Sequence, residues 1–145
     1  MKVNYSEINE RAVDMLLSIK KHVPSIDKNL KALVEIRVSQ INGCAYCVDL
    51  HSNEARQLGE SQQKLDCLPV WKESLLFSEN EMVALNWAES VTNISTEPDV
   101  DEKLKILLVH YSETEAVDLT LIIVLMNSLN RLAISFGDKP PRRNA

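Results

Sequence analysis

Two cysteines and a histidine, Cys44, Cys47 and His51, have the residue types and the spacing that thiol redox chemistry requires. On a helix, positions i, i+3 and i+7 share one face, so these three side chains are expected to lie within reach of one another. The reactive form of cysteine is the thiolate, whereas an ordinary thiol has a pKa of about 8.5 and is mostly protonated at neutral pH. A helix that begins after Gly43 would favour a thiolate in its first turn through its free amides and positive dipole end. The pattern predicts a dithiol in which His51 accepts the thiol proton and an oxidised sulfur is captured as a Cys44–Cys47 disulfide.

Two other interpretations of the same residues stay open. Cys44, Cys47, His51 and Cys67 could supply four nitrogen and sulfur ligands to zinc. Zinc sites, however, usually pair two short ligand clusters, and this chain contains one. Alternatively, the cysteines are simply buried packing residues, which is the simplest interpretation of Cys67. His110, a single histidine before a turn, is expected to be structural or solvent-facing. No metal is therefore predicted.

The segment from Leu33 to His51, LVEIRVSQINGCAYCVDLH, resembles the core of the AhpD-like alkylhydroperoxidases of the carboxymuconolactone decarboxylase superfamily. Shorter matching segments lie at 54–56, 58–60, 71–73 and 127–133, so the resemblance extends from about Leu30 to Phe136. It implies an all-α, single-domain helical bundle in which the CxxCxxxH motif begins a central helix. It also implies a homo-oligomer, a trimer or a hexamer.

The resemblance implies roles for individual residues. Cys47 would meet the peroxide or a partner disulfide, Cys44 would resolve the oxidised sulfur, and His51 would be the proton-relay base. The family's relay glutamate lies twelve residues before the first cysteine, where this chain has Ala32. Glu35 follows one helical turn later and could either reach a similar place or be a surface residue.

The implied activity is a thiol-dependent peroxidase that needs no bound cofactor. A hydroperoxide would be the substrate, and a lipoamide-type or protein dithiol would be the external reductant, with a peroxiredoxin as a candidate partner. Tyr46 stands where some members carry a histidine, which removes another relay group. One alternative is a protein disulfide relay with the same residues. Alternatives of another class are a lactone decarboxylase, which needs no cysteine pair, and a non-catalytic zinc-binding domain.

Composition restricts the setting in which this chemistry takes place. The 145 residues, 45% of them hydrophobic, fit one domain, 1–145. A net charge of −5 and an aromatic content of 5% argue against a nucleic-acid partner. The first residues lack the apolar core of a signal peptide, and no stretch is expected to span a membrane. We therefore expect a cytoplasmic protein, in which a C-x-x-C pair is catalytic or metal-binding rather than structural.

Helical signals run along the whole chain, and no strand alternation occurs. With three glycines in all, a phosphate-binding loop and a dinucleotide fingerprint are excluded. Caps and periodicity predict helices over 5–22, from Asp27 to Gly43, over 44–58, after Ser61, after the Ser78 capping box, over 101–110 and over 113–136.

The helix predicted over 113–136 is apolar on nearly every side from Leu119 to Met126, which is typical of a helix that is buried all round. A chain of this size rarely surrounds one helix so completely, so subunit contacts are expected to complete its cover. The polar residues Asp118, Asn127, Asn130 and Arg131 are expected to form an internal hydrogen-bonded lock. The tail 139–145 contains two prolines and cannot continue the helix.

Overall fold

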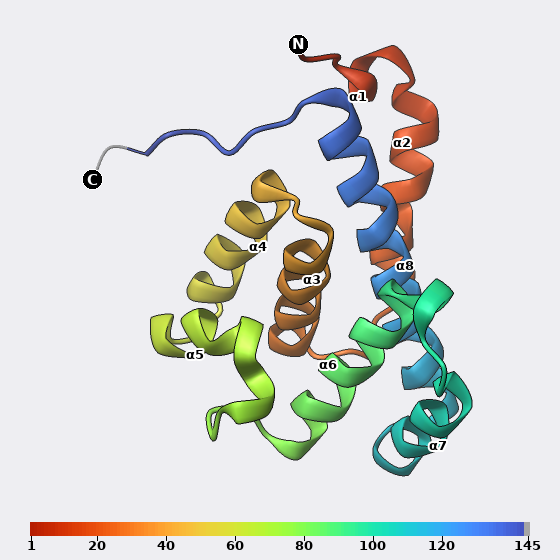
Figure 1. Ribbon diagram of the computed structural model, residues 1–145. Coiled ribbons are helices and arrows are strands. Elements are labelled where there is room, and N and C mark those ends of the chain that lie inside the picture. Colours follow the sequence, from red (N-terminus) through yellow and green to blue (C-terminus); the bar gives the residue numbers. More distant parts are fainter. Residues whose placement is uncertain (144–145) are drawn as a thin grey trace.

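The computed structural model describes residues 1–143 and contains only helices and connections over that range (Figure 1). The predicted all-α fold is therefore confirmed. The tail residues 144–145 lie outside the described residues. The elements are α1 (Tyr5–Ile8), α2 (Glu10–Leu17), the 3₁₀ helix η1 (Ser18–His22), α3 (Lys28–Asn42), α4 (Ala45–Gln57), α5 (Gln62–Cys67), η2 (Leu68–Glu73), α6 (Glu79–Thr92), η3 (Ile94–Thr96), α7 (Val100–His110) and α8 (Glu113–Phe136).

Helix α3 is the centre of the bundle, with α4, α6 and α8 packed around it (Figure 1). One apolar cluster joins α3 to α6 and α8, and a second joins α3 to α5, η2 and α6. Leu33, Leu119 and Ile123 are fully buried in these clusters. Each such side chain contributes roughly 1.5–3 kcal/mol through burial. The helix that leads into the cysteine motif is thus held firmly on several sides.

The junction between α3 and α4 places the cysteines. Asp27 caps α3 by accepting hydrogen bonds from two backbone amides. Gly43 ends α3 in the left-handed conformation, with φ +72°, where a side chain would be strained. Cys44 then caps α4, because its Sγ accepts a hydrogen bond from the Cys47 amide at 3.3 Å. Both cysteines therefore lie at the start of α4, as the sequence predicted.

A buried polar network ties α3 to α8. The Asn42 side-chain amide donates to Asn127 Oδ1 at 2.9 Å and to Asn130 Oδ1 at 3.0 Å. Asn130 in turn donates to Ser39 Oγ at 3.0 Å. Asn130 and Ser39 are completely buried. The predicted internal lock is confirmed for Asn127 and Asn130.

The other two predicted members of the lock have different partners. Asp118 accepts hydrogen bonds from the Ser25 hydroxyl at 2.6 Å and from the Ser25 amide at 3.3 Å, so it anchors the connection before α3. Arg131 is exposed and donates to Asn127 at the edge of the network.

The prediction of one helix over 5–22 is wrong. The helix breaks at Asn9, with φ −134° and ψ 62°, and the Asn9 side chain caps α2 by accepting from the Ala12 amide at 3.3 Å. Residues Ser18–His22 continue as a 3₁₀ helix. The apolar spacing continues across both changes, so it did not predict them. The helix breaks because the short amide side chain of Asn9 offers the backbone a competing hydrogen bond.

Within one chain α8 is not covered on every side, which agrees with the expectation that a single chain would not surround it completely. Val117, Leu121 and Val124 remain 58%, 39% and 47% exposed, while their neighbours Ile122 and Ile123 are buried. The inner face of α8 therefore packs on its own domain, and its outer face is also apolar but exposed.

Helix α8 meets the length and hydropathy criteria of a candidate membrane span. The helix has 24 residues and a window of mean hydropathy 1.6, which suffices by length and composition alone. Core helices of soluble domains pass the same test, and α8 packs against α3 and α6 with its inner face. We interpret α8 as such a core helix.

Candidate functional site

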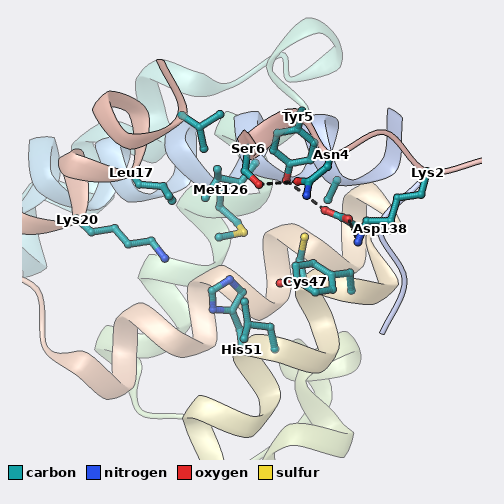
Figure 2. Close-up of a pocket in the computed structure, with 15 residues that line it drawn as sticks. Lys2, Asn4, Tyr5, Ser6, Leu17, Lys20, Cys47, His51, Met126 and Asp138 are labelled. Carbon is teal, nitrogen blue, oxygen red and sulfur yellow. Dashed lines mark hydrogen bonds and ion pairs between the residues drawn. The ribbon is translucent and has the colours of Figure 1, made fainter. Parts of the chain in front are cut away.

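The two cysteines of the motif are joined in a disulfide, with their Cα atoms 5.3 Å apart. Cys44 is 1% exposed and Cys47 is 4% exposed. Cys47 lines a partly open cavity together with His51, whereas Cys44 lines a shallow groove on another side of α4. Of the two sulfurs, that of Cys47 is the one placed to meet a molecule in the cavity (Figure 2).

His51 is held by two carboxylates that meet the same ring nitrogen. Its Nδ1 lies 3.2 Å from Glu35 Oε2 and 2.8 Å from Glu54 Oε2. Ionised carboxylates only accept hydrogen bonds, so these two contacts favour the tautomer with its proton on Nδ1. The remaining nitrogen, Nε2, is then the one that can exchange a proton with a thiol.

Glu35 faces inward, which decides between the two positions that the sequence left open. Its side chain is almost fully buried and lies 3.8 Å from Lys31 Nζ as well as beside His51. A buried carboxylate needs such partners to offset its desolvation. Ala32, at the position of the family glutamate, is buried too, one turn earlier on α3.

Glu54 is a site residue that the sequence reasoning missed. It lies one turn after His51 on α4, and side chains at i and i+3 on a helix are neighbours. That spacing was the available signal, but it does not distinguish a solvated glutamate from one that meets the imidazole. Glu54 is 45% exposed, so it closes the outer side of His51 while Glu35 closes the inner side.

The same cluster is the one group of metal-binding type among residues 1–143. The ligand atoms of Glu35, His51 and Glu54 all lie within 4.8 Å of one another, a set that suits a divalent cation. The four-ligand zinc set considered from the sequence is not assembled in this oxidised form, because Cys44 and Cys47 are bonded to each other. Cys67 is half-buried and packs on the cluster that contains Trp71.

His110 lies elsewhere and contacts Asn80 at 3.0 Å. It does not line the cavity that holds Cys47.

The cavity beside Cys47 has a volume of about 330 Å³ and is closed by parts of the chain far apart in sequence (Figure 2). The segment around Tyr5, helix α2, helix α4 and helix α8 all contribute side chains. The Tyr5 hydroxyl donates to Asp138 at 3.2 Å, and Lys2 forms an ion pair with Asp138 at 3.0 Å. Burial and the nearby Asp138 charge raise the pKa of Tyr5 to about 12, so its hydroxyl stays protonated.

Comparisons with known proteins agree with this architecture. Residues 7–90 match the model of the Carboxymuconolactone decarboxylase family. The uncharacterized protein YdfG of Bacillus subtilis is 38% identical over 140 residues, which cover 95% of either chain.

Two solved structures extend the comparison. A protein of unknown function from Agrobacterium tumefaciens, for which a role as the antioxidant defence protein AhpD has been suggested, is 32% identical with a TM-score of 0.93. The alignment covers 98% of this chain and 99% of that one. The debrominase Bmp8 is 22% identical with a TM-score of 0.82, over 93% of this chain and 74% of its own, and shares the fold.

The helical architecture, the cysteine pair at the start of α4 and these matches lead to one assignment. The chain belongs to the carboxymuconolactone decarboxylase family and has its AhpD-like helical fold.

Proposed function

We propose that this protein is a thiol-dependent peroxidase that reduces hydroperoxides through a Cys44–Cys47 dithiol-disulfide cycle. The observation that carries the proposal is the position of Cys47, which shares a cavity with His51 and forms a disulfide with Cys44. The family supports a peroxidase-like role in antioxidant defence.

In the first step, His51 Nε2 takes the proton of the Cys47 thiol. The thiolate attacks the distal oxygen of the hydroperoxide, the O–O bond breaks, and Cys47 becomes a sulfenic acid. The leaving alkoxide receives the proton from His51 and departs as an alcohol. The imidazolium that forms in between is stabilised by the carboxylates of Glu35 and Glu54, which lie against Nδ1.

In the second step, the Cys44 thiol attacks the sulfenic sulfur of Cys47, water leaves, and the disulfide forms. An external dithiol, of the lipoamide type or on a protein, then reduces the disulfide by two exchanges and is itself oxidised. A cytoplasmic location would supply such reductants, and a peroxiredoxin could act in the same reaction sequence.

The test is a single addition of an organic hydroperoxide to reduced protein, followed by mass mapping of the cysteines. We expect the wild type to yield one alcohol and one Cys44–Cys47 disulfide. Cys44→Ser should stop at a trapped Cys47 sulfenic acid, and Cys47→Ser should consume no peroxide. Cys67→Ser is the matched control and should behave as the wild type.

The protein disulfide relay remains the second candidate, because it uses the same sulfurs. The same reduced protein should then be offered an oxidised protein disulfide in place of the peroxide. Consumption of the disulfide alone, with the peroxide untouched, would replace the peroxidase proposal with the relay. Zinc bound stoichiometrically to protein purified without chelators would instead favour the metal-binding domain.

A further inference from the structure

Two lysines and one carboxylate line the cavity beside Cys47, although the chain as a whole carries −5 and two further carboxylates, of Glu35 and Glu54, contact His51 Nδ1. The lysines and carboxylates that line the cavity are Lys2, Lys20 and Asp138. Asp138 is matched by its ion pair with Lys2 and by the hydrogen bond from Tyr5. Lys20 forms no ion pair with any residue of the described range 1–143.

Lys20 is placed to act on the contents of the cavity. It belongs to η1, is half-buried, and extends its ammonium group into the space that Cys47 and His51 also face (Figure 2). The next residue, Lys21, is exposed and does not line the cavity. An ammonium group without a counter-ion attracts an anion that enters the same space.

Apolar side chains form part of the rest of the cavity wall: Val13 and Leu17 from α2, Leu50 from α4, and Met126 and Leu129 from α8. The polar side chains of Asn4, Tyr5, Ser6 and Tyr46 line it as well. A volume of about 330 Å³ is at the lower end of the range of ligand pockets, roughly 300–1,000 Å³. The space therefore suits a short apolar body with one charged end.

We propose that the cavity selects small organic hydroperoxides that carry a carboxylate, and that Lys20 binds the carboxylate while the peroxide group meets Cys47. The hydroperoxide part of this inference rests on the proposed peroxidase function. The preference for an anion does not, because it follows from the charge and the shape of the cavity.

The first experiment measures the preference for an anion without any peroxide. Reduced protein with Cys67→Ser is alkylated at Cys47 by iodoacetate and, separately, by iodoacetamide, which are similar in size and differ in charge. Both reagents react with the thiolate, so the ratio of the two rates does not depend on the fraction of Cys47 that is ionised. Lys20→Met should lower the ratio about fivefold, as expected for the loss of one nearby opposite charge at a partly exposed site. Lys21→Met is the matched control and should leave the ratio unchanged.

The second experiment compares a carboxylate-bearing hydroperoxide with its methyl ester in single-turnover oxidation of Cys47. The wild type should prefer the acid, and Lys20→Met should lose that preference, whereas Lys21→Met should keep both the preference and the rate with the ester. An alkylation ratio that is equal in wild type and Lys20→Met overturns the anion site. If Lys20→Met lowers the alkylation ratio but the wild type does not prefer the acid hydroperoxide to its ester, the substrate assignment is overturned. Failure to react with either peroxide removes the proposed peroxidase function, and the alkylation ratio still decides whether the cavity selects anions.

Discussion

At the scale of single residues, Glu35 and Glu54 offer a direct comparison, because both contact His51 Nδ1 from different depths. Water and salt screen the charge of the buried Glu35 carboxylate less than that of the exposed Glu54 carboxylate. Glu35 should therefore stabilise the His51 imidazolium more strongly. We predict that Glu35→Gln slows the reaction of Cys47 with hydroperoxide about tenfold at neutral pH, since about 1.4 kcal/mol of stabilisation would be lost. The pH midpoint of Cys47 alkylation should also move to higher pH.

The matched variant for this prediction is Glu54→Gln, whose carboxylate is 45% exposed. On a logarithmic scale, we expect Glu54→Gln to lower the rate of the reaction with hydroperoxide by less than half as much as Glu35→Gln does. Circular dichroism would verify that both variants keep the fold. An unchanged pH profile in Glu35→Gln would remove Glu35 from the proton relay and leave it a structural role only.

The chemistry of the site could be predicted from the sequence where it depends on local spacing. Cys47 is joined to Cys44 and shares a cavity with His51, and spacing along one helix was sufficient to predict these two pairs. Whether Glu35 reaches the site depends on how α3 is rotated relative to α4. The apolar periodicity of α3 did not show which face of the helix Glu35 occupies. Tyr5 and Lys20 reach the cavity through tertiary packing of the N-terminal segments, which no local pattern records.

At the scale of the elements, the network of Asn42, Asn127, Asn130 and Ser39 holds α3 against α8. Asn130 is completely buried and bonds to both Asn42 and Ser39. We predict that Asn130→Ala lowers the free energy of unfolding by about 2–3 kcal/mol, because it removes the hydrogen bonds to Asn42 and Ser39 and opens a small cavity. Chemical denaturation with the disulfide kept oxidised would measure the change.

The control for the network is Ser128→Ala. Ser128 bonds only to the carbonyl of Val124 in its own helix, at 3.0 Å. Its removal should change the free energy of unfolding by less than about 0.5 kcal/mol. If the two substitutions cost the same, the network does not stabilise the α3–α8 contact.

A second inter-element contact should respond to pH. Burial of Glu89 on α6 opposes its ionisation, but hydrogen bonds from Trp71 and Arg37 and the charges of Arg37 and Lys72 outweigh it, and the pKa of Glu89 lies below its ordinary value. A carboxyl group with a lowered pKa in the folded state stabilises the fold above its unfolded pKa, and this stabilisation is lost as pH falls through the folded value.

We therefore predict that Glu89→Gln costs about 1–2 kcal/mol of unfolding free energy at pH 7. The cost should shrink as pH is lowered from about 5 towards 3, where the wild type also loses the charge. Denaturation curves recorded across this range would show it. Glu73→Gln, at an exposed site, should show no such convergence. A cost for Glu89→Gln that is constant with pH would contradict the ionic origin of the contact.

The boundaries of most elements followed from the sequence because capping groups act locally. Asp27 and Ser78 each cap the helix that they were predicted to begin, and Ser112 caps α8 at the predicted boundary. The break at Asn9 was missed because the apolar spacing continues on both sides of it. The inner and outer faces of α8 could not be separated, since both are apolar and only the packed structure shows which one the domain covers.

At the scale of the whole molecule, the outer face of α8 is apolar and uncovered. Val117, Leu121 and Val124 lie along this face. Leu104 and Leu108 of α7 are also exposed and line an apolar groove together with Val117 and Leu121. Exposed apolar surface of this kind marks interaction sites in soluble proteins. We propose that a second copy of the chain covers it, in a trimer or a hexamer.

The substitution Val124→Asp tests the assembly. Val124 is 47% exposed, so a carboxylate there is tolerated in an isolated subunit, but in an interface it would be buried without a partner. We predict that the wild type elutes as an oligomer and Val124→Asp as a monomer with unchanged helical content, as measured by size exclusion with light scattering. Val70→Asp, an equal change at a 59% exposed valine on η2, should remain assembled. A monomeric wild type at micromolar concentration, or an assembled Val124→Asp variant, would show that the outer face of α8 does not join the subunits.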